Sequence, residues 1–377
     1  MAIKNNRPII TYENVAILMS DAPAYSVNSN TGYNLSFLPF VQSIDLSFDA
    51  ERTNVGSIGS KKIIDSSNRS APDVNFNINI YEDFELLFYN MFSGSGIREN
   101  LNLDRNFYAI IGDERGYDIS NRDLSEEDFL SFGNCFLQNI SISQSINSLM
   151  SSQYSFVGSN IQAQKLTQDG NIFSGKCPAI DLTGGQTQGI DVKFNDIESY
   201  YSNEFGRIIT PYSTNIIISG ENSIGNFLIE SDSVQSFDLN LPVNRKTIYG
   251  LGKKYPVSRK ALFPSVGSFD FANKISTFEV SGDRANLKDF LNTDENYTLI
   301  ISGSNHEGRG FNLKIKDAKL GSQNTSSSIG GELISSLSFS FDTTNCDTVV
   351  PAFDNLLKLQ DGSELQNADG GYVLLEF

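Results

Sequence analysis

The sequence predicts a mainly β protein made of two tandem copies of one domain. Residues 41–46 read VQSIDL and return as VQSFDL at 234–239, with five of six positions identical and a shift of 234 − 41 = 193 residues. Other landmarks recur in the same order. Aromatic residues make up 11% of the chain, all Phe or Tyr, and such residues favour the half-buried surface of a sheet. An ordered internal repeat indicates that one structural unit is used twice.

Size and composition restrict the class of protein. The chain has 377 residues, enough for two domains, with a net charge of −17 and a pI near 4.5. A chain this acidic is not expected to grip DNA, because binding to the phosphate backbone depends on Lys and Arg. The N-terminus lacks the apolar core of a signal peptide, and no apolar run approaches the length of a membrane span. The three distant cysteines, Cys135, Cys177 and Cys346, favour reduced thiols over a disulfide framework.

Each predicted copy opens with a short apolar strand and continues into the VQS strand. The apolar run 15–19 follows Ile-Ile-Thr and Tyr, and the same order recurs within 208–219, a shift of 208 − 9 = 199. In both VQS segments apolar residues alternate with polar ones, which predicts strands with one buried and one polar face. Asp45, Asp49 and Asp238 fall on the polar side.

A basic loop, a further strand and a helix follow in each copy. The loops carry Lys61 and Lys62 in the first copy and Lys253 and Lys254 in the second, and each leads to a proline and a new strand. The spacing then changes to i, i+3, i+4, i+7 at Phe84, which predicts an amphipathic helix at 84–91. A matching pattern at 287–291 predicts the second helix, 287 − 87 = 200 residues later.

A hairpin closes each copy and fixes the predicted domain boundaries. The first hairpin pairs the region of Ile140 with that of Tyr154, and the second pairs 313–315 with 339–341. We therefore expect a first domain at 1–157, a connector at 158–206, a second domain at 207–345 and a C-terminal extension at 346–377 containing a hairpin. The drifting shift is what insertions and deletions in loops produce. The alternative is two unrelated β domains with generic strand patterns.

The sequence offers no constellation of catalytic, cofactor-binding or metal-binding residues. His306, the one histidine, lies in a turn-like segment, and a lone surface histidine is a poor candidate for a general base. The 250–254 segment suggests a phosphate loop only superficially, because it lacks the full spacing and a following helix pattern. Carboxylates are plentiful, and none is singled out. We expect a protein that is not an enzyme and needs no cofactor or metal.

The order of these features resembles the tail tube proteins of tailed bacteriophages. The VQS strand, the basic loop, the proline-led strand, one helix and a closing hairpin carry the resemblance, over residues 8–157 and 207–341. The resemblance implies two tandem tail-tube-like β-barrel or sandwich domains, each with one flanking α-helix. Six such domains form a ring in that family, so two per chain imply a trimeric, pseudo-hexameric ring. The first copy departs from the pattern in its irregular 65–68 loop and its longer insertion at about 95–134.

The resemblance also implies partners and a location. Stacked rings would surround a channel that holds the tape measure protein and later passes DNA without binding it specifically. Tail terminator and baseplate proteins, and a sheath if the tail contracts, would be further partners, with no membrane partner. The protein would belong to the virion tail and assemble in the host cytoplasm. Asp45, Asp49 and Asp238 are candidate channel-lining residues, and Lys61, Lys62, Lys253 and Lys254 are candidate contacts between rings.

Three other functions remain open at this point. Baseplate hub proteins and tube initiators also duplicate a tube domain, and such a protein would form trimers that do not extend. A β-rich adhesin would carry exposed aromatic clusters, although the absence of Trp counts against glycan binding. An enzyme is the least favoured alternative.

Overall fold

A computed structural model of the chain confirms the predicted mainly β fold. Most of the described residues belong to antiparallel strands, and the helical pieces among them are two 3-10 turns, η4 (Pro211–Ser213) and η7 (Thr343–Asn345). The predicted helices at 84–91 and 287–291 and the predicted tail hairpin lie outside the described residues. The structure describes residues 15–20, 35–38, 40–49, 52–56, 58, 63–68, 73–82, 101–102, 104–111, 128–165, 167–169, 172–177, 190–195, 208–222, 225–229, 234–251, 255–274, 296–304, 310–326 and 334–349.

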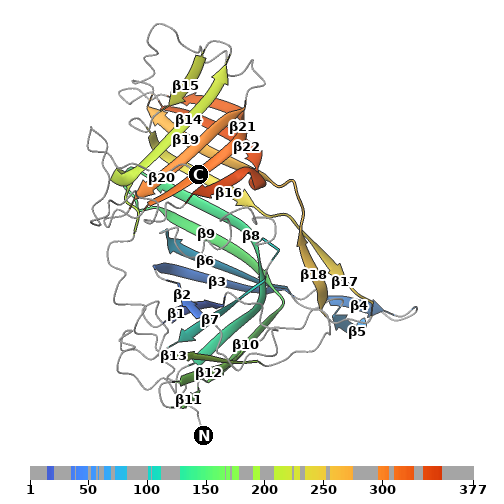
Figure 1. Ribbon diagram of the computed structural model, residues 1–377. Helices are drawn as coiled ribbons and strands as arrows, with labels where there is room; N and C mark the ends of the chain where they lie inside the picture. Colours follow the sequence, from blue (N-terminus) through green and yellow to red (C-terminus); the bar gives the residue numbers. More distant parts are fainter. Residues whose placement is uncertain are drawn as a thin grey trace.

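The first ten strands form two sheets and a separate hairpin. One sheet has the order β3-β6-β9-β8, and the other has the order β2-β1-β7-β8 with β10 on the far side of β8. The 18-residue β8 is long enough to belong to both sheets (Figure 1). Strands β4 and β5 pair only with each other and form the hairpin. The bounds are β1 (Val15–Ser20), β2 (Leu35–Phe37), β3 (Val41–Asp49), β4 (Arg52–Gly56), β5 (Ile63–Asn68), β6 (Asp73–Tyr81), β7 (Arg105–Ile111), β8 (Asp128–Ser145), β9 (Ser151–Gly158) and β10 (Asn160–Lys165).

Ten later strands follow the same pairing scheme. One sheet has the order β16-β19-β22-β21, the other has the order β15-β14-β20-β21 with β23 on the far side of β21, and β17 pairs with β18. Every pairing of the first group therefore has a counterpart in the second, in the same chain order. The bounds are β14 (Thr214–Asn222), β15 (Gly225–Ile229), β16 (Val234–Pro242), β17 (Arg245–Tyr249), β18 (Pro256–Ala261), β19 (Val266–Lys274), β20 (Tyr297–Ser304), β21 (Gly310–Ser326), β22 (Ile334–Asp342) and β23 (Cys346–Val349).

The irregularities of the two groups also coincide. The β3–β6 ladder skips Gln42, and the β16–β19 ladder skips Gln235, again 193 residues later. The long strands β8 and β21 each turn at a residue with positive φ, Asn134 (φ 53) and Asp317 (φ 56), which are 317 − 134 = 183 residues apart. Bulges redirect a strand, so these two residues lie where each long strand passes from one sheet to the other.

Each group encloses an apolar core between its two sheets. In the first, Phe76 of β6 stacks on Phe132 of β8 at a centroid distance of 4.4 Å and lies 5.2 Å from Phe107. In the second, Phe339 of β22 meets Tyr297 of β20 edge to face at 5.5 Å. All five rings are buried, because the alternation along each strand directs them between the sheets.

Two regions differ from what the sequence predicts, the connector and the second closing hairpin. The predicted connector region contains β10, which pairs with β8, and a small sheet of β11 (Thr167–Asp169), β12 (Ile172–Cys177) and β13 (Ile190–Asn195). The second closing hairpin exists, but Phe339 pairs with Leu320 and not with residues 313–315. Those residues pair with β20 and β23, because β21 runs 17 residues and passes through both sheets.

Candidate functional site

The two four-stranded sheets join edge to edge into one sheet with a polar face. Its strand order is β3-β6-β9-β8-β16-β19-β22-β21. Along each strand, every second side chain points away from the apolar cores. Lys319 lies opposite Ser340 in the outermost ladder and is exposed, so one cation borders this face on β21. The polar face consists of Ser43, Asp45 and Ser47 (β3), Asn75, Asn77 and Asn79 (β6), Ser151, Gln153 and Ser155 (β9), Ser141, Ser143 and Ser145 (β8), Ser236, Asp238 and Asn240 (β16), Ser268, Asp270 and Ala272 (β19), Ser336, Ser338 and Ser340 (β22), and Ser322 and Asn324 (β21).

The polar face carries its negative charge on a few aspartates. Asp45 and Asp238 are both exposed on it, as the alternation of the VQS segments predicts. Asp49 is the last residue of β3, opposite Asp73 in the ladder. Asp270 lies directly opposite Asp238 and was not singled out from the sequence, although it alternates with buried Phe269 and Phe271.

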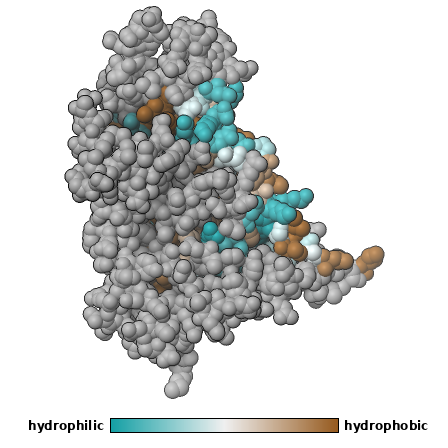
Figure 2. Space-filling model, viewed as in Figure 1, coloured by the Kyte–Doolittle hydropathy of each residue, from teal (hydrophilic) through white to brown (hydrophobic). Residues whose placement is uncertain are grey.

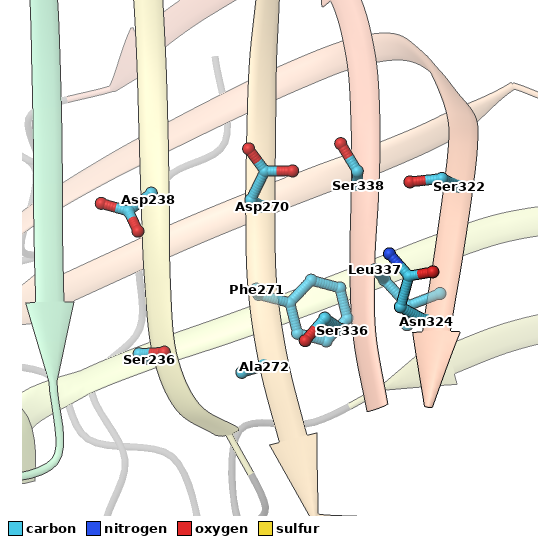
Figure 3. A pocket seen from close by; sticks show the side chains of 10 residues that line it. All are labelled: Ser236, Asp238, Asp270, Phe271, Ala272, Ser322, Asn324, Ser336, Leu337 and Ser338. Carbon is cyan, nitrogen blue, oxygen red and sulfur yellow. The ribbon is translucent and has the colours of Figure 1, made fainter. Parts of the chain in front are cut away.

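The Asp238 carboxyl is the perturbed acid of this face. Partial burial raises its pKa, and the neighbouring Asp270 carboxylate raises it further. The two aspartates line a shallow depression of about 300 Å³ with Ser236, Ser338 and Asn324 (Figure 3). Polar groups from four adjacent strands line this hollow, and none of them is cationic.

The joint between the two halves is an antiparallel ladder between β16 and β8. It runs from the pair Ser236 and Ser145 to the pair Pro242 and Asn139. Two backbone hydrogen bonds extend it, with the Ile146 N–H donating to Gln235 O (3.0 Å) and the Val243 N–H donating to Gln138 O (2.7 Å). We call this ladder and its flanking contacts the internal joint.

Two arginines of the β17–β18 hairpin reinforce the internal joint. Arg259 is buried and donates to the Asp73 carboxylate and to Gly158 O, both in the first half. Arg245 donates to the carbonyls of Leu137 and Leu101, also in the first half.

The Arg245 guanidinium is held in an environment that disfavours its charge. It lies 5.2 Å from the centre of the Phe136 ring, a favourable cation–π contact. Burial, with a contribution from Arg259, lowers its pKa to about 10, so it stays charged at neutral pH. Arg52 lies 245 − 52 = 193 residues earlier, at the equivalent place in the β4–β5 ladder, and neither arginine's sequence context predicts these contacts.

The ends of the joined sheet are strands equivalent to those of the internal joint. Within the described residues, β3 pairs with β6 alone, and the second half of β21 pairs with β22 alone. Leu46 of β3 is 43% exposed, whereas its equivalent in β16, Leu239, is 0% exposed. The difference indicates that the outer edge of β3 presents apolar surface that β16 buries in the internal joint.

The hairpins β4–β5 and β17–β18 project on the same side of the molecule (Figure 1). Their turns carry Ile58 and Leu251, which are 251 − 58 = 193 residues apart and fully exposed. Figure 2 shows apolar surface in brown at this projecting end. The candidate ring contacts Lys61, Lys62, Lys253 and Lys254 follow these residues in the sequence and lie outside the described residues.

The described residues offer little else for chemistry. They contain no group of three or more metal-ligating side chains, and their range includes no helix long and apolar enough to cross a membrane. His306 lies outside them. Cys135 and Cys346 are buried and form no disulfide, as expected for reduced thiols.

Comparison with solved structures finds a distant likeness to a prophage protein. No family model matches this chain, and no curated protein matches it. Among solved structures it is similar to the anti-feeding prophage cap, described as the AFP tube terminating cap, with 14% identity and a TM-score of 0.27 over 44% of this chain and 99% of that one. This TM-score does not show a common fold, so strand pairing and sequence pattern carry the functional argument.

Proposed function

We propose that this chain is a structural subunit of a phage-type tail tube, built from two copies of one tube domain. The observation that carries the proposal is the internal joint. It already pairs the edge of one half with the edge of the other, and it leaves the equivalent edges, β3 and β21, at the two ends of the sheet. A head-to-tail joint between two different edges, with the equivalents of both edges left at the ends of the described sheet, generates a ring when the rotation closes.

The register of the internal joint can be transferred to the two outer edges of the sheet, β3 and β21. The internal joint places Asp238, Leu239 and Asn240 opposite Ser143, Ile142 and Ser141. Shifting the first set by −193 and the second by +183 places Asp45, Leu46 and Ser47 of one chain opposite Ser326, Thr325 and Asn324 of the next. Three chains joined this way would close a barrel of 3 × 8 = 24 strands, which removes the exposed sheet edges.

In such a ring the polar face would line the channel. Its hydroxyl, amide and carboxylate groups hold water and release no counterions from DNA, and the cation at its border, Lys319, lies on the outermost strand, so nucleic acid would pass with little adhesion. Asp45, Asp49 and Asp238 keep their proposed place on this wall, and Asp270 joins them. The tape measure protein would occupy the same channel before DNA does.

The projecting hairpins would connect successive rings. Their exposed tips, Ile58 and Leu251, supply apolar surface, and Lys61, Lys62, Lys253 and Lys254 supply positive charge that suits an acidic neighbour. Terminator and baseplate proteins would cap the two ends of the stack in the virion tail. The role is structural and requires no catalysis.

Electron microscopy and sedimentation of the pure protein test the proposal. We expect trimeric rings or stacked tubes, and we expect Leu46→Lys to abolish them by placing a charge in the chain-to-chain ladder. Tyr212→Lys is the matched control, because Tyr212 is 97% exposed and lies on η4, away from both edges of the joined sheet. Wild-type protein that stays monomeric at millimolar concentration would contradict the ring.

The same images separate the tube from its nearest alternative. Trimers that form readily and never stack would instead indicate a baseplate hub or a tube initiator with duplicated domains.

A further inference from the structure

The internal joint and the proposed chain-to-chain joint use equivalent strands but different residues. We propose that the chain-to-chain joint is a weakened copy of the internal one, so that closure with a second copy of this chain is reversible and is completed only against a neighbouring ring. The inference rests on the proposed ring and adds a statement about its affinity. Three independent positions in the ladders support it.

The first difference is the ion pair. At the internal joint Arg259 is 4% exposed and bonds the carboxylate of Asp73. Register equivalence, 259 − 193 = 66 and 73 + 193 = 266, puts Ser66 and Val266 at the matching places of the chain-to-chain joint. Val266 is 65% exposed where Asp73 is bonded. A serine and a valine cannot form the charge-assisted hydrogen bond.

The second difference concerns the cation–π contact between Arg245 and the Phe136 ring. Arg245 lies over Phe136. Arg52 is the equivalent of Arg245, and Lys319 occupies the position of Phe136, since 136 + 183 = 319. A cation–π attraction in the internal joint is therefore replaced by two like charges across the chain-to-chain joint.

The third difference is the apolar contact across the ladder. Ile142 and Ile140 of β8, both buried, face Leu239 and Leu241 of β16. Their equivalents on β21 are Thr325 and Gln323, because 142 + 183 = 325 and 140 + 183 = 323. In the ladder, Leu46 of the next chain would therefore lie opposite a threonine where Leu239 lies opposite an isoleucine, which reduces the apolar surface available for burial.

All three differences act in one direction. Each removes from the chain-to-chain joint an attraction that the internal joint has, while the backbone ladder of both stays the same. A joint with fewer side-chain attractions closes more weakly in solution and gains affinity from contacts with the ring below. Such a chain would add to a growing tube more readily than it would close into free rings.

Restoring the missing groups tests the inference. The double variant Ser66→Arg, Val266→Asp rebuilds the ion pair, and Lys319→Phe rebuilds the ring contact. We expect the rebuilt ion pair to lower the protein concentration at which half of the chains are trimeric by about tenfold or more, because hydrogen bonds to charged groups are worth at least that factor. Lys319→Phe should lower it by about two- to fivefold, because a cation–π contact at an exposed site is weaker. Mass photometry and sedimentation over a concentration series measure the midpoint.

A like-charge variant is the matched control. Ser66→Arg with Val266→Arg makes the same two substitutions without a pair, and we expect it to shift the midpoint upward or leave it unchanged. An equal gain from this control, or wild-type rings with nanomolar midpoints that neither variant improves, overturns the inference and leaves the ring intact. Monomers from every variant at every concentration overturn the ring itself. Thermal unfolding of each variant shows that the fold is kept.

Discussion

At the scale of single residues, the charged side chains Arg259, Arg245 and Asp104, which are buried or half-buried, each have a polar partner in the folded chain. Arg259 of the second half bonds Asp73 in the first, and Arg245 donates to two carbonyls of the first half and to the Arg259 carbonyl of its own hairpin. Asp104, also buried, accepts a hydrogen bond from Asn134 at 2.6 Å, and burial still raises its pKa. None of these partnerships follows a local spacing, so the sequence could mark the residues and not their contacts.

The Asp238 and Asp270 pair makes stability depend on pH. Because folding raises the pKa of Asp238, its stabilising contribution is complete below its ordinary pKa of about 4 and is lost as pH rises through the higher folded value. We expect Asp270→Asn to raise the free energy of unfolding at pH 7 by a few tenths of a kcal/mol, since water screens these exposed groups. The gain should shrink toward pH 3.5.

Urea denaturation at both pH values measures this effect. Ser268→Asn, a neutral change on the same strand and face, is the control and should show no such dependence on pH. A loss of stability at pH 7 in the Asp270→Asn variant would show that the second carboxylate is favourable there.

At the scale of elements, the alternation of apolar and polar residues predicted the short strands well and the long ones poorly. The VQS strands and the pairing of Ile140 with Tyr154 follow the prediction. The second hairpin was placed in the wrong part of β21, because a bulge and a positive-φ residue, Asp317, interrupt the period of two within one strand. A backbone turn of this kind leaves no periodic signal in the sequence.

A reciprocal exchange between the halves follows from the matched ladders. In the second half Gly267 faces Phe341, and a Cβ on Gly267 would come within 2.7 Å of that ring. In the first half the equivalent pair is Val74 and Gly158, with the large and small residues exchanged. We expect Gly267→Val to lower the free energy of unfolding by about 1–3 kcal/mol through overpacking, and Phe341→Gly to lower it by about 3–5 kcal/mol through the cavity.

The double variant is the informative one. Gly267→Val with Phe341→Gly reproduces the pair of the first half, so its loss should be smaller than the sum of the single losses. Chemical denaturation of the four proteins in the cycle measures the coupling. Strictly additive losses would show that the two halves do not share this packing solution.

At the scale of the whole molecule, the fold class and the order of landmarks could be predicted, whereas the joining of the halves could not. The sequence repeat indicates which strands of the two halves correspond. It does not predict that β16 pairs with β8. The candidate wall residues Asp45 and Asp238 lie on the polar face, and Asp270 was missed because its strand was read for its apolar residues. The loop lysines fall outside the described residues, so their role stays a prediction.

The polar face, which carries Asp45, Asp238 and Asp270, predicts how the protein interacts with DNA. We expect the wild-type protein to show no binding to duplex DNA at 50 mM salt. Asp238→Lys with Asp270→Lys should introduce weak binding that disappears as salt is raised, because phosphate contacts release counterions. Fluorescence anisotropy of a labelled duplex measures both.

A neutral substitution of the same two aspartates is the control for that experiment. Asp238→Asn with Asp270→Asn removes the same negative charges without adding cations and should remain non-binding. Wild-type protein that binds DNA more tightly than the lysine variant would contradict an electrostatically non-adhesive wall.

The internal joint has a practical consequence for measurement. An interface between subunits normally has to be studied in an assembly, where opening one contact disturbs the others. Here the ladder between β16 and β8, with its two arginines and its apolar pairs, joins the two halves of one covalent chain. Amide hydrogen exchange along β16 therefore reports, in one dilute polypeptide, the free energy needed to unzip a seam of this geometry.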